Sequence, residues 1–208
     1  MKKNIKKIML TGLVALLAII TFTACGDDTG DNNTEGAGDN TKVQVEMENG
    51  DTFVIELYPE YAPETVDNFV KLVKDGFFDG LTFHRIIDGF MAQGGGYDPS
   101  GAKKDSPSIK GEFSENGFTQ NTLQHTKGVI SMARNGFDMN SASSEFFIMF
   151  DYAYSAMGLD GKYAAFGQVI EGMDVVDKFQ EIERELDSSG DMSSPTTPVV
   201  IKKVTMAN

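Results

Sequence analysis

The sequence contains few of the residues that carry metal and redox chemistry. Its 208 residues include one cysteine, two histidines and no tryptophan. A single cysteine excludes an intrachain disulfide, a CxxC redox motif and a zinc site built from several thiolates, and two histidines leave little for a His-rich metal site. We therefore expect a protein with no metal ion and no other cofactor.

Positive charge is also scarce. The chain carries 18 Lys and Arg against 31 Asp and Glu, a formal net charge of -13. Such a balance offers no basic surface to phosphate backbones, which argues against a nucleic-acid partner. Hydrophobic residues make up 40% of the chain, which at this length is enough for one ordinary domain and too little for two.

The N-terminus has the layout of a secretory signal. Four lysines, at positions 2, 3, 6 and 7, precede an apolar stretch over residues 8–22. A cationic segment followed by an apolar one too short for a comfortable membrane span predicts a signal peptide over residues 1–24. The alternative is a buried or amphipathic N-terminal helix, but residues 9–22 offer only Thr and Gly for its polar face.

The only cysteine follows directly. Phe22-Thr23-Ala24-Cys25 resembles a bacterial lipobox, with Phe22 where Leu is usual. In lipoproteins of this kind the cysteine becomes the lipidated first residue of the mature chain, so the resemblance implies anchoring through Cys25 to the outer face of the bacterial cytoplasmic membrane. A free thiol after an ordinary signal peptide is the alternative.

The segment after Cys25 is acidic and contains nothing to bury. Residues 26–41 have five acidic side chains and no large apolar one. We predict a disordered tether over residues 25–41 and a globular domain over residues 42–208. Cleavage before Cys25 would leave 14 basic residues against 31 acidic ones, a net charge of -17.

Hydrophobic periodicity in the globular part indicates a mainly β domain. Alternation over residues 43–47 and 53–57 around Asn49-Gly50 predicts a β-hairpin, and apolar spacing over residues 63–75 predicts an amphipathic helix. Many short strands with two helices favour an antiparallel barrel or sandwich. The other expected strands are residues 81–86, 128–133, 145–150, 163–170 and 199–206, and the second expected helix is residues 173–180.

Several common types of active site are disfavoured. No GxSxG motif occurs, so a hydrolase with a nucleophile elbow is not expected, and the glycine run 94–96 lacks a following Lys-Ser/Thr, so we interpret it as a turn. His84 and His125 could form a metal pair, but neither has an acidic or Cys neighbour at ligand-like spacing. Hydrogen-bonded structural histidines are the better interpretation.

One arginine stands out because its neighbours are apolar. Strand alternation from Phe83 places Phe83, Arg85 and Ile87 on one face. A guanidinium among large apolar groups must find acceptors or serve a function, since desolvating it unpaired is costly. A structural arginine paired with an acid across the sheet is the alternative, and residue types alone do not decide between the two.

The segment around this arginine, FHRIIDGFMAQGG over residues 83–95, resembles the signature of the cyclophilin family of peptidyl-prolyl isomerases. Further matches follow in the family's order, and the similarity runs over residues 42–206. The resemblance implies a closed eight-stranded antiparallel β-barrel capped by two α-helices, and isomerase activity on proline-containing polypeptides. The further matches are VISMAR at 129–134, NSASSEFFI at 140–148, LDGKY at 159–163 and FG at 166–167.

The resemblance also implies roles for individual residues. Arg85 matches the catalytic arginine that hydrogen-bonds the prolyl nitrogen or the adjacent carbonyl, and Gln93 matches the residue that holds this arginine. Phe146 should point the other way along its strand, into the core, and barrel core is also the alternative for Phe90, Met91 and Phe147. The expected catalytic residues are Arg85, Phe90 and Gln93, and the expected substrate-binding residues are His84, Met91, Ala133, Arg134, Glu145, Phe147, Leu159 and Tyr163.

Four positions depart from the best-known family members. Arg134, Glu145 and Tyr163 stand where those proteins have Asn, Gln and His, and Gly158 replaces a Trp. Loss of the indole removes a donor and contact area, so we expect weak cyclosporin binding with catalysis largely kept; nanomolar inhibition of peptide isomerisation would contradict this. We also expect the Glu145 carboxylate to pair with Arg134 and to tune how firmly Arg85 is held.

The sequence thus predicts a monomeric, lipid-anchored isomerase that assists the folding of exported proteins. A non-catalytic peptide-binding or adhesion lipoprotein on the same barrel is the main alternative. A transporter's solute-binding protein is a weaker one, because it explains only the acidic lipoprotein-like N-terminus.

Overall fold

The computed structural model describes residues 41–151 and 158–207. The predicted signal peptide, Cys25 and nearly all of the predicted tether therefore lie outside the described residues. None of the helices within these two ranges is long and apolar enough to cross a membrane.

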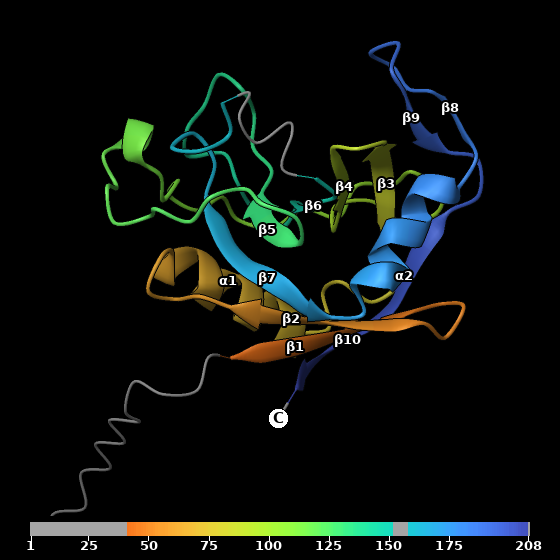
Figure 1. The fold of residues 1–208 in the computed structure, drawn as a ribbon, viewed down its shortest axis with the longest axis horizontal. Helices are drawn as coiled ribbons and strands as arrows, with labels where there is room; N and C mark the ends of the chain where they lie inside the picture. Colours follow the sequence, from red (N-terminus) through yellow and green to blue (C-terminus); the bar gives the residue numbers. More distant parts are fainter. Residues whose placement is uncertain (1–40, 152–157, 208) are drawn as a thin grey trace, which may run out of the picture. The chain divides into compact units, whose positions relative to one another are not determined.

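Eight antiparallel strands form a closed barrel in the order β1-β10-β3-β4-β6-β5-β7-β2 (Figure 1). Two further strands, β8 (Arg184–Leu186) and β9 (Met192–Pro195), form a separate hairpin. The predicted closed eight-stranded barrel with two helices is confirmed. The barrel strands are β1 (Lys42–Met47), β2 (Thr52–Leu57), β3 (Thr82–Ile87), β4 (Met91–Gly94), β5 (Val129–Met132), β6 (Phe146–Met149), β7 (Ala165–Glu171) and β10 (Val199–Ala207).

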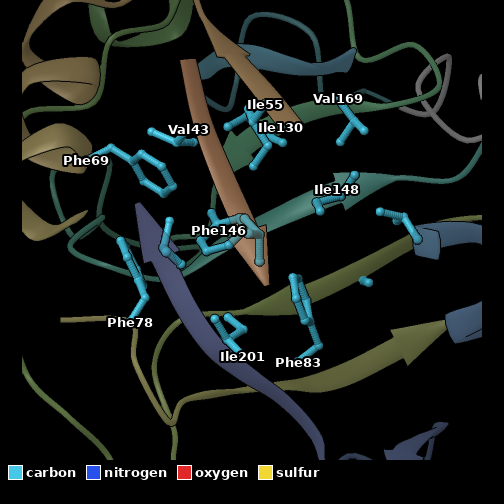
Figure 2. Close-up of a cluster of buried hydrophobic side chains, with 14 of the residues drawn as sticks. Val43, Ile55, Phe69, Phe78, Phe83, Ile130, Phe146, Ile148, Val169 and Ile201 are labelled. Atoms are coloured by element: carbon cyan, nitrogen blue, oxygen red, sulfur yellow. The ribbon is translucent and has the colours of Figure 1, made fainter. Parts of the chain in front are cut away.

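The interior of the barrel is filled with side chains. Phe69, from helix α1 (Pro63–Lys74), lies with its ring centroid 5.0 Å from that of Phe78 and 5.4 Å from that of Phe146. Figure 2 shows these rings among the aliphatic side chains of the surrounding strands. Because the interior is packed core, a ligand site must lie on the outer surface of the barrel.

A buried carboxylate fastens α1 to the long segment that precedes β5. The N-cap residue of the helix is Ala62, whose side chain cannot accept a hydrogen bond. Glu112, only 2% exposed, accepts instead from the backbone N–H of Glu64 (3.1 Å) and from the backbone N–H and hydroxyl of Thr65 (2.8 and 2.7 Å). The charge of the carboxylate also suits the positive end of the helix dipole.

The second helix is shorter than expected. The predicted helix over residues 173–180 is an α-helix over Met173–Asp177 (α2) followed by a 3-10 turn over Lys178–Glu181. The ring of Phe179 in that turn packs 5.1 Å from Phe83, between centroids. The tighter turn keeps this aromatic side chain on the barrel, so tertiary packing decides where the α-helix ends.

Candidate active site

The site begins at an irregularity in β3. Phe83 pairs with Gly94 and Arg85 with Gln93, so His84 is one extra residue, a β-bulge. Phe83 is fully buried in the barrel core, whereas Arg85 and Ile87 face outward. The prediction that Phe83 shares a face with Arg85 and Ile87 is wrong, because the bulge shifts the alternation by one residue.

Strand register places four side chains in a row across the outer face of the sheet. Arg85 on β3 lies opposite Gln93 on β4, which lies opposite Phe147 on β6, which lies opposite Ser131 on β5. The neighbouring Phe146 points into the core, as predicted. Three adjacent strands, β3, β4 and β6, therefore fix the spacing from the cationic side chain of Arg85 to the aromatic ring of Phe147.

A pocket of about 220 Å³ opens on this face. It is smaller than the pockets that hold drug-sized ligands and suits a single small side chain. The structure brings together nine of the eleven residues expected to touch or act on substrate, while His84 and Glu145 lie outside the lining. The pocket is lined by Arg85, Phe90, Met91, Gln93, Ala133, Arg134, Phe147, Leu159 and Tyr163.

Five of the nine side chains that line this pocket are apolar. Met91, Phe147 and Met149 form a small buried cluster of their own, separate from the barrel core. The ring of Tyr163 meets Phe147 edge-on at 6.0 Å between centroids. Met91 and Phe147 are 2% and 5% exposed and belong to this separate cluster, so they are buried but are not part of the barrel core.

Behind the pocket, His125 is locked in a hydrogen-bond chain. Its Nδ1 lies 2.7 Å from Asp160 Oδ1, its Nε2 lies 2.9 Å from Ser131 Oγ, and its ring stacks on Phe147. Burial lowers the pKa of His125, although Asp160 opposes this shift. The predicted hydrogen-bonded histidine is confirmed.

This Ser-His-Asp chain resembles that of a hydrolase. No sequence motif marks it, because Asp160 lies 35 residues after His125 and Ser131 is in no GxSxG motif. Ser131 is fully buried and does not line the pocket. Its hydroxyl therefore cannot reach a substrate carbonyl, and the chain instead supports the pocket wall. Within the described ranges, no group of three or more His, Cys, Asp or Glu side chains could hold a metal ion.

The prediction that Glu145 pairs with Arg134 is wrong. Arg134 donates to the backbone carbonyls of Lys162 and Asn135, both at 2.9 Å, and its guanidinium lies 4.6 Å from the Tyr163 ring centre. A planar guanidinium gains both from stacking and from these carbonyl acceptors, which the sequence could not reveal.

Glu145 faces the other side of the site. Its Oε2 accepts from Gln93 Nε2 at 2.9 Å and lies 3.6 Å from His84 Nε2. The hydrogen bond of the Gln93 amide thus goes to Glu145 and not to Arg85. Burial lowers the pKa of His84, and the Arg85 charge lowers it further while Glu145 raises it.

The acidic partners of Arg85 lie far from it along the chain and were not predicted from the sequence. Its side chain is 33% exposed, with Nε 3.8 Å from Asp187 Oδ2 and Nη2 3.6 Å from Asp191 Oδ2. Both acids lie in the turn between β8 and β9, about 100 residues further along the chain. The only sequence signal was the polar turn Asp187-Ser188-Ser189-Gly190-Asp191, which by itself indicates a tight turn.

The family described as cyclophilin type peptidyl-prolyl cis-trans isomerase/CLD matches residues 42–206. The chain belongs to the cyclophilins. Peptidyl-prolyl cis-trans isomerase B of Escherichia coli is 36% identical over 171 residues, which cover 79% of this chain and 99% of that protein. The predictions of a cyclophilin and of an isomerase are confirmed at the level of the family.

Two eukaryotic proteins resemble the same cyclophilin domain. Peptidyl-prolyl cis-trans isomerase-like 2 of Gibberella zeae is 37% identical over 163 residues, 78% of this chain but only 26% of that longer protein. A cyclophilin of Cryptosporidium parvum, crystallised in the presence of the dipeptide Ala-Pro, superposes with a TM-score of 0.65 at 25% identity, covering 80% of this chain and 99% of that one.

A cyclophilin pocket of this kind can act on an amide without covalent chemistry. Rotation about a peptide C–N bond meets a barrier of about 18–20 kcal/mol because resonance makes the bond partly double. An apolar pocket can hold a proline ring while a charged donor favours the twisted amide, whose nitrogen has regained its lone pair. The described pocket combines apolar side chains with the charged side chain of Arg85.

Proposed function

We propose that this cyclophilin accelerates rotation of X-Pro bonds in exported proteins while lipid-anchored to the outer face of the bacterial cytoplasmic membrane. One observation carries the catalytic part: Arg85 stands at the edge of an otherwise mainly apolar pocket of about 220 Å³. The location is supported by the sequence alone, through the cationic and apolar N-terminus and Cys25.

In this proposal the proline ring of a client polypeptide enters between Met91, Phe147 and Leu159. Phe90 closes the pocket beside the ring, and Ala133 lies in the lining where the peptide backbone would pass. The Ala-Pro dipeptide used with the Cryptosporidium parvum relative is consistent with a proline-containing ligand. Tyr163 and Arg134 complete the wall opposite Arg85.

The energy required sets how much Arg85 must contribute. Millisecond turnover of a bond that isomerises over tens of seconds needs about 5.5–7 kcal/mol of transition-state stabilisation. A charge-assisted hydrogen bond contributes about 1.5–3 kcal/mol, so the fixed, largely dry pocket must supply the remainder.

Replacement of Arg85 tests the catalytic part. We expect Arg85→Ala to lower kcat/KM for an X-Pro peptide about 10²-fold, because the donor to the twisted amide is lost. A protease-coupled or NMR-exchange assay measures the rates, and Lys202→Ala, which removes a surface cation paired with Glu46, serves as the control. Equal rates for wild type and Arg85→Ala would favour the peptide-binding or adhesion lipoprotein.

Mass spectrometry of the mature N-terminus tests the anchor. We expect the chain to begin at a diacylated Cys25, since two acyl chains suffice for stable membrane attachment, and Cys25→Ser to abolish that attachment. An unmodified thiol at Cys25 in the membrane fraction would refute the lipid anchor and leave the isomerase proposal untouched.

A further inference from the structure

We propose that the β8–β9 hairpin is a positioning device for Arg85, in which the carboxylates of Asp187 and Asp191 hold the guanidinium at the rim of the proline pocket. The inference rests on the proposed function, in which Arg85 acts on the prolyl amide. The hairpin lies beside β3, the strand that carries Arg85 (Figure 1). Neither acid belongs to the pocket lining, so both would act only through Arg85.

The two contacts restrain Arg85 without using up its donors. The N···O separations of 3.8 Å to Asp187 and 3.6 Å to Asp191 are longer than hydrogen bonds. Attraction between opposite charges at this range still favours one placement of a flexible side chain. The N–H groups of the guanidinium stay available for the substrate.

The turn that carries these acids is built around the Asp187 carboxylate. Its Oδ1 accepts from the backbone N–H of Ser189 (2.8 Å) and of Asp191 (3.1 Å), and its Oδ2 accepts from Ser193 Oγ (2.6 Å). Ser193 is fully buried and is the extra residue of a bulge in β9. The bulge turns the Ser193 hydroxyl toward the carboxylate, so Asp187 is fixed before any substrate arrives.

The base of the hairpin is tied to the turn between β3 and β4. Arg184 Nη2 lies 2.6 Å from Asp88 Oδ2, and Arg184 Nη1 donates to the carbonyl of Gln180 at 3.2 Å. The side chain of Gln180 in turn accepts from Gly89 N–H at 2.9 Å. The acids and Arg85 are therefore mounted on elements that are fastened to each other.

Arg85 needs such a restraint because it stands between two cavities. It lines the proline pocket and also a groove of about 600 Å³ that His84, Tyr97 and Asp187 help to form. An unrestrained arginine would sample both cavities, and only one placement puts its donors at the prolyl amide. Fixing that placement beforehand lowers the entropy cost of reaching the transition state.

Asp191→Asn is the principal test, because the Asp191 backbone makes the turn hydrogen bonds while its side chain contacts Arg85. We expect kcat to fall about five- to tenfold with KM changed less than twofold, since the restraint matters most in the transition state. Asp187→Asn should act in the same direction. The matched control is Asp98→Asn, which removes a turn-closing carboxylate on the same groove and should leave kcat unchanged.

A second readout separates positioning from folding. The NMR signal of the Arg85 Nε–H group in the substrate-free protein should shift in Asp191→Asn and stay in place in Asp98→Asn. In an Arg85→Ala background, Asp191→Asn should have no further effect on the rate. A variant that merely unfolded the hairpin would instead lower the rate in that background too.

Unchanged kcat in both acid variants overturns the proposal, whatever the NMR signal does. A raised kcat also overturns it, because the acids would then be competing with the substrate for Arg85. If the wild type shows no isomerase activity, the proposed function fails on its own, and the Nε–H shift alone decides whether the turn holds Arg85.

Discussion

At the residue scale, the neighbours Phe146 and Phe147 have different roles, one in the stability of the barrel and the other in the pocket. Phe146 is 1% exposed and packs edge-on against Phe69, Phe78 and Phe83 inside the barrel. Phe147 is 5% exposed and lines the pocket on the outer face. Strand alternation sends two chemically identical neighbours to different tasks.

Leucine substitutions should separate these tasks. We expect Phe146→Leu to lower the free energy of unfolding by about 1–2 kcal/mol with kcat/KM of the folded protein unchanged, because only core contacts are lost. Phe147→Leu should lower kcat/KM about tenfold, because the pocket wall loses its flat aromatic surface. Urea unfolding and a peptide isomerisation assay on both variants measure the two effects, and the same pattern in both would contradict the division.

The sequence predicted which residues line the pocket, but it did not predict which partners the charged side chains contact. The family signature named all nine lining residues, since they lie in short contiguous segments. The partners of Arg85, Arg134 and Glu145 could not be predicted, because each lies on another strand or turn whose placement depends on the whole fold. The backbone conformation of Gly158 could not be predicted from the sequence either. Its φ of 100° lies in a region that a Trp residue would adopt only with strain.

At the element scale, the stability of α1 depends on a residue outside the helix. Glu112 caps its N-terminus from 47 residues away along the chain. We expect Glu112→Gln to lower the free energy of unfolding by about 2–3 kcal/mol, because an amide cannot replace three hydrogen bonds to a charged acceptor.

Denaturant unfolding measures that loss, and Glu115→Gln provides the matched control. Glu115 is half exposed, and its nearest cation, Lys162, is 3.8 Å away. Its substitution should change the free energy of unfolding by less than about 0.5 kcal/mol. Equal changes in the free energy of unfolding for the two substitutions would show that the hydrogen bonds of the buried Glu112 cap do not stabilise the fold more than a surface ion pair does.

Elements with several periods of alternation were predicted, and three of the short strands were not. The hairpin of β1 and β2, helix α1 and strand β10 each repeat their pattern often enough to be recognised. Strands β4, β8 and β9, of three or four residues, were missed, whereas the equally short β5 and β6 were predicted as short apolar runs. The bulge at His84 was missed because register depends on the partner strand, not on the strand itself.

At the scale of the whole molecule, both histidines make stability depend on pH in the same direction. The pKa values of His84 and His125 are both lowered, chiefly by burial. In the unfolded chain a histidine takes up its proton near pH 6.5, so below that pH the unfolded state binds more protons than the folded one. Stability is therefore complete above about pH 6.5 and falls as the pH drops toward the folded-state pKa values.

We expect the free energy of unfolding to fall between pH 7.5 and pH 5, because both histidines take up a proton more readily in the unfolded chain. Urea unfolding at a series of pH values measures this slope. His125→Gln should be less stable at pH 7.5 and should lose about half of the slope, with the remainder due to His84. A slope unchanged by His125→Gln would show that His125 is protonated as readily in the folded protein as in the unfolded chain.

The place of β10 in the barrel also determines when the domain can form. β10 pairs with β1 along residues 42–47 and with β3 at Thr82 and Phe83, so this strand lies between two strands from the first half of the chain. Until residues 199–207 are available, β1 and β3 present open edges and the barrel stays unclosed. Because pairings between distant segments are slow to form, a chain still emerging from a ribosome would stay in an aggregation-prone state until the nine residues of β10 are available.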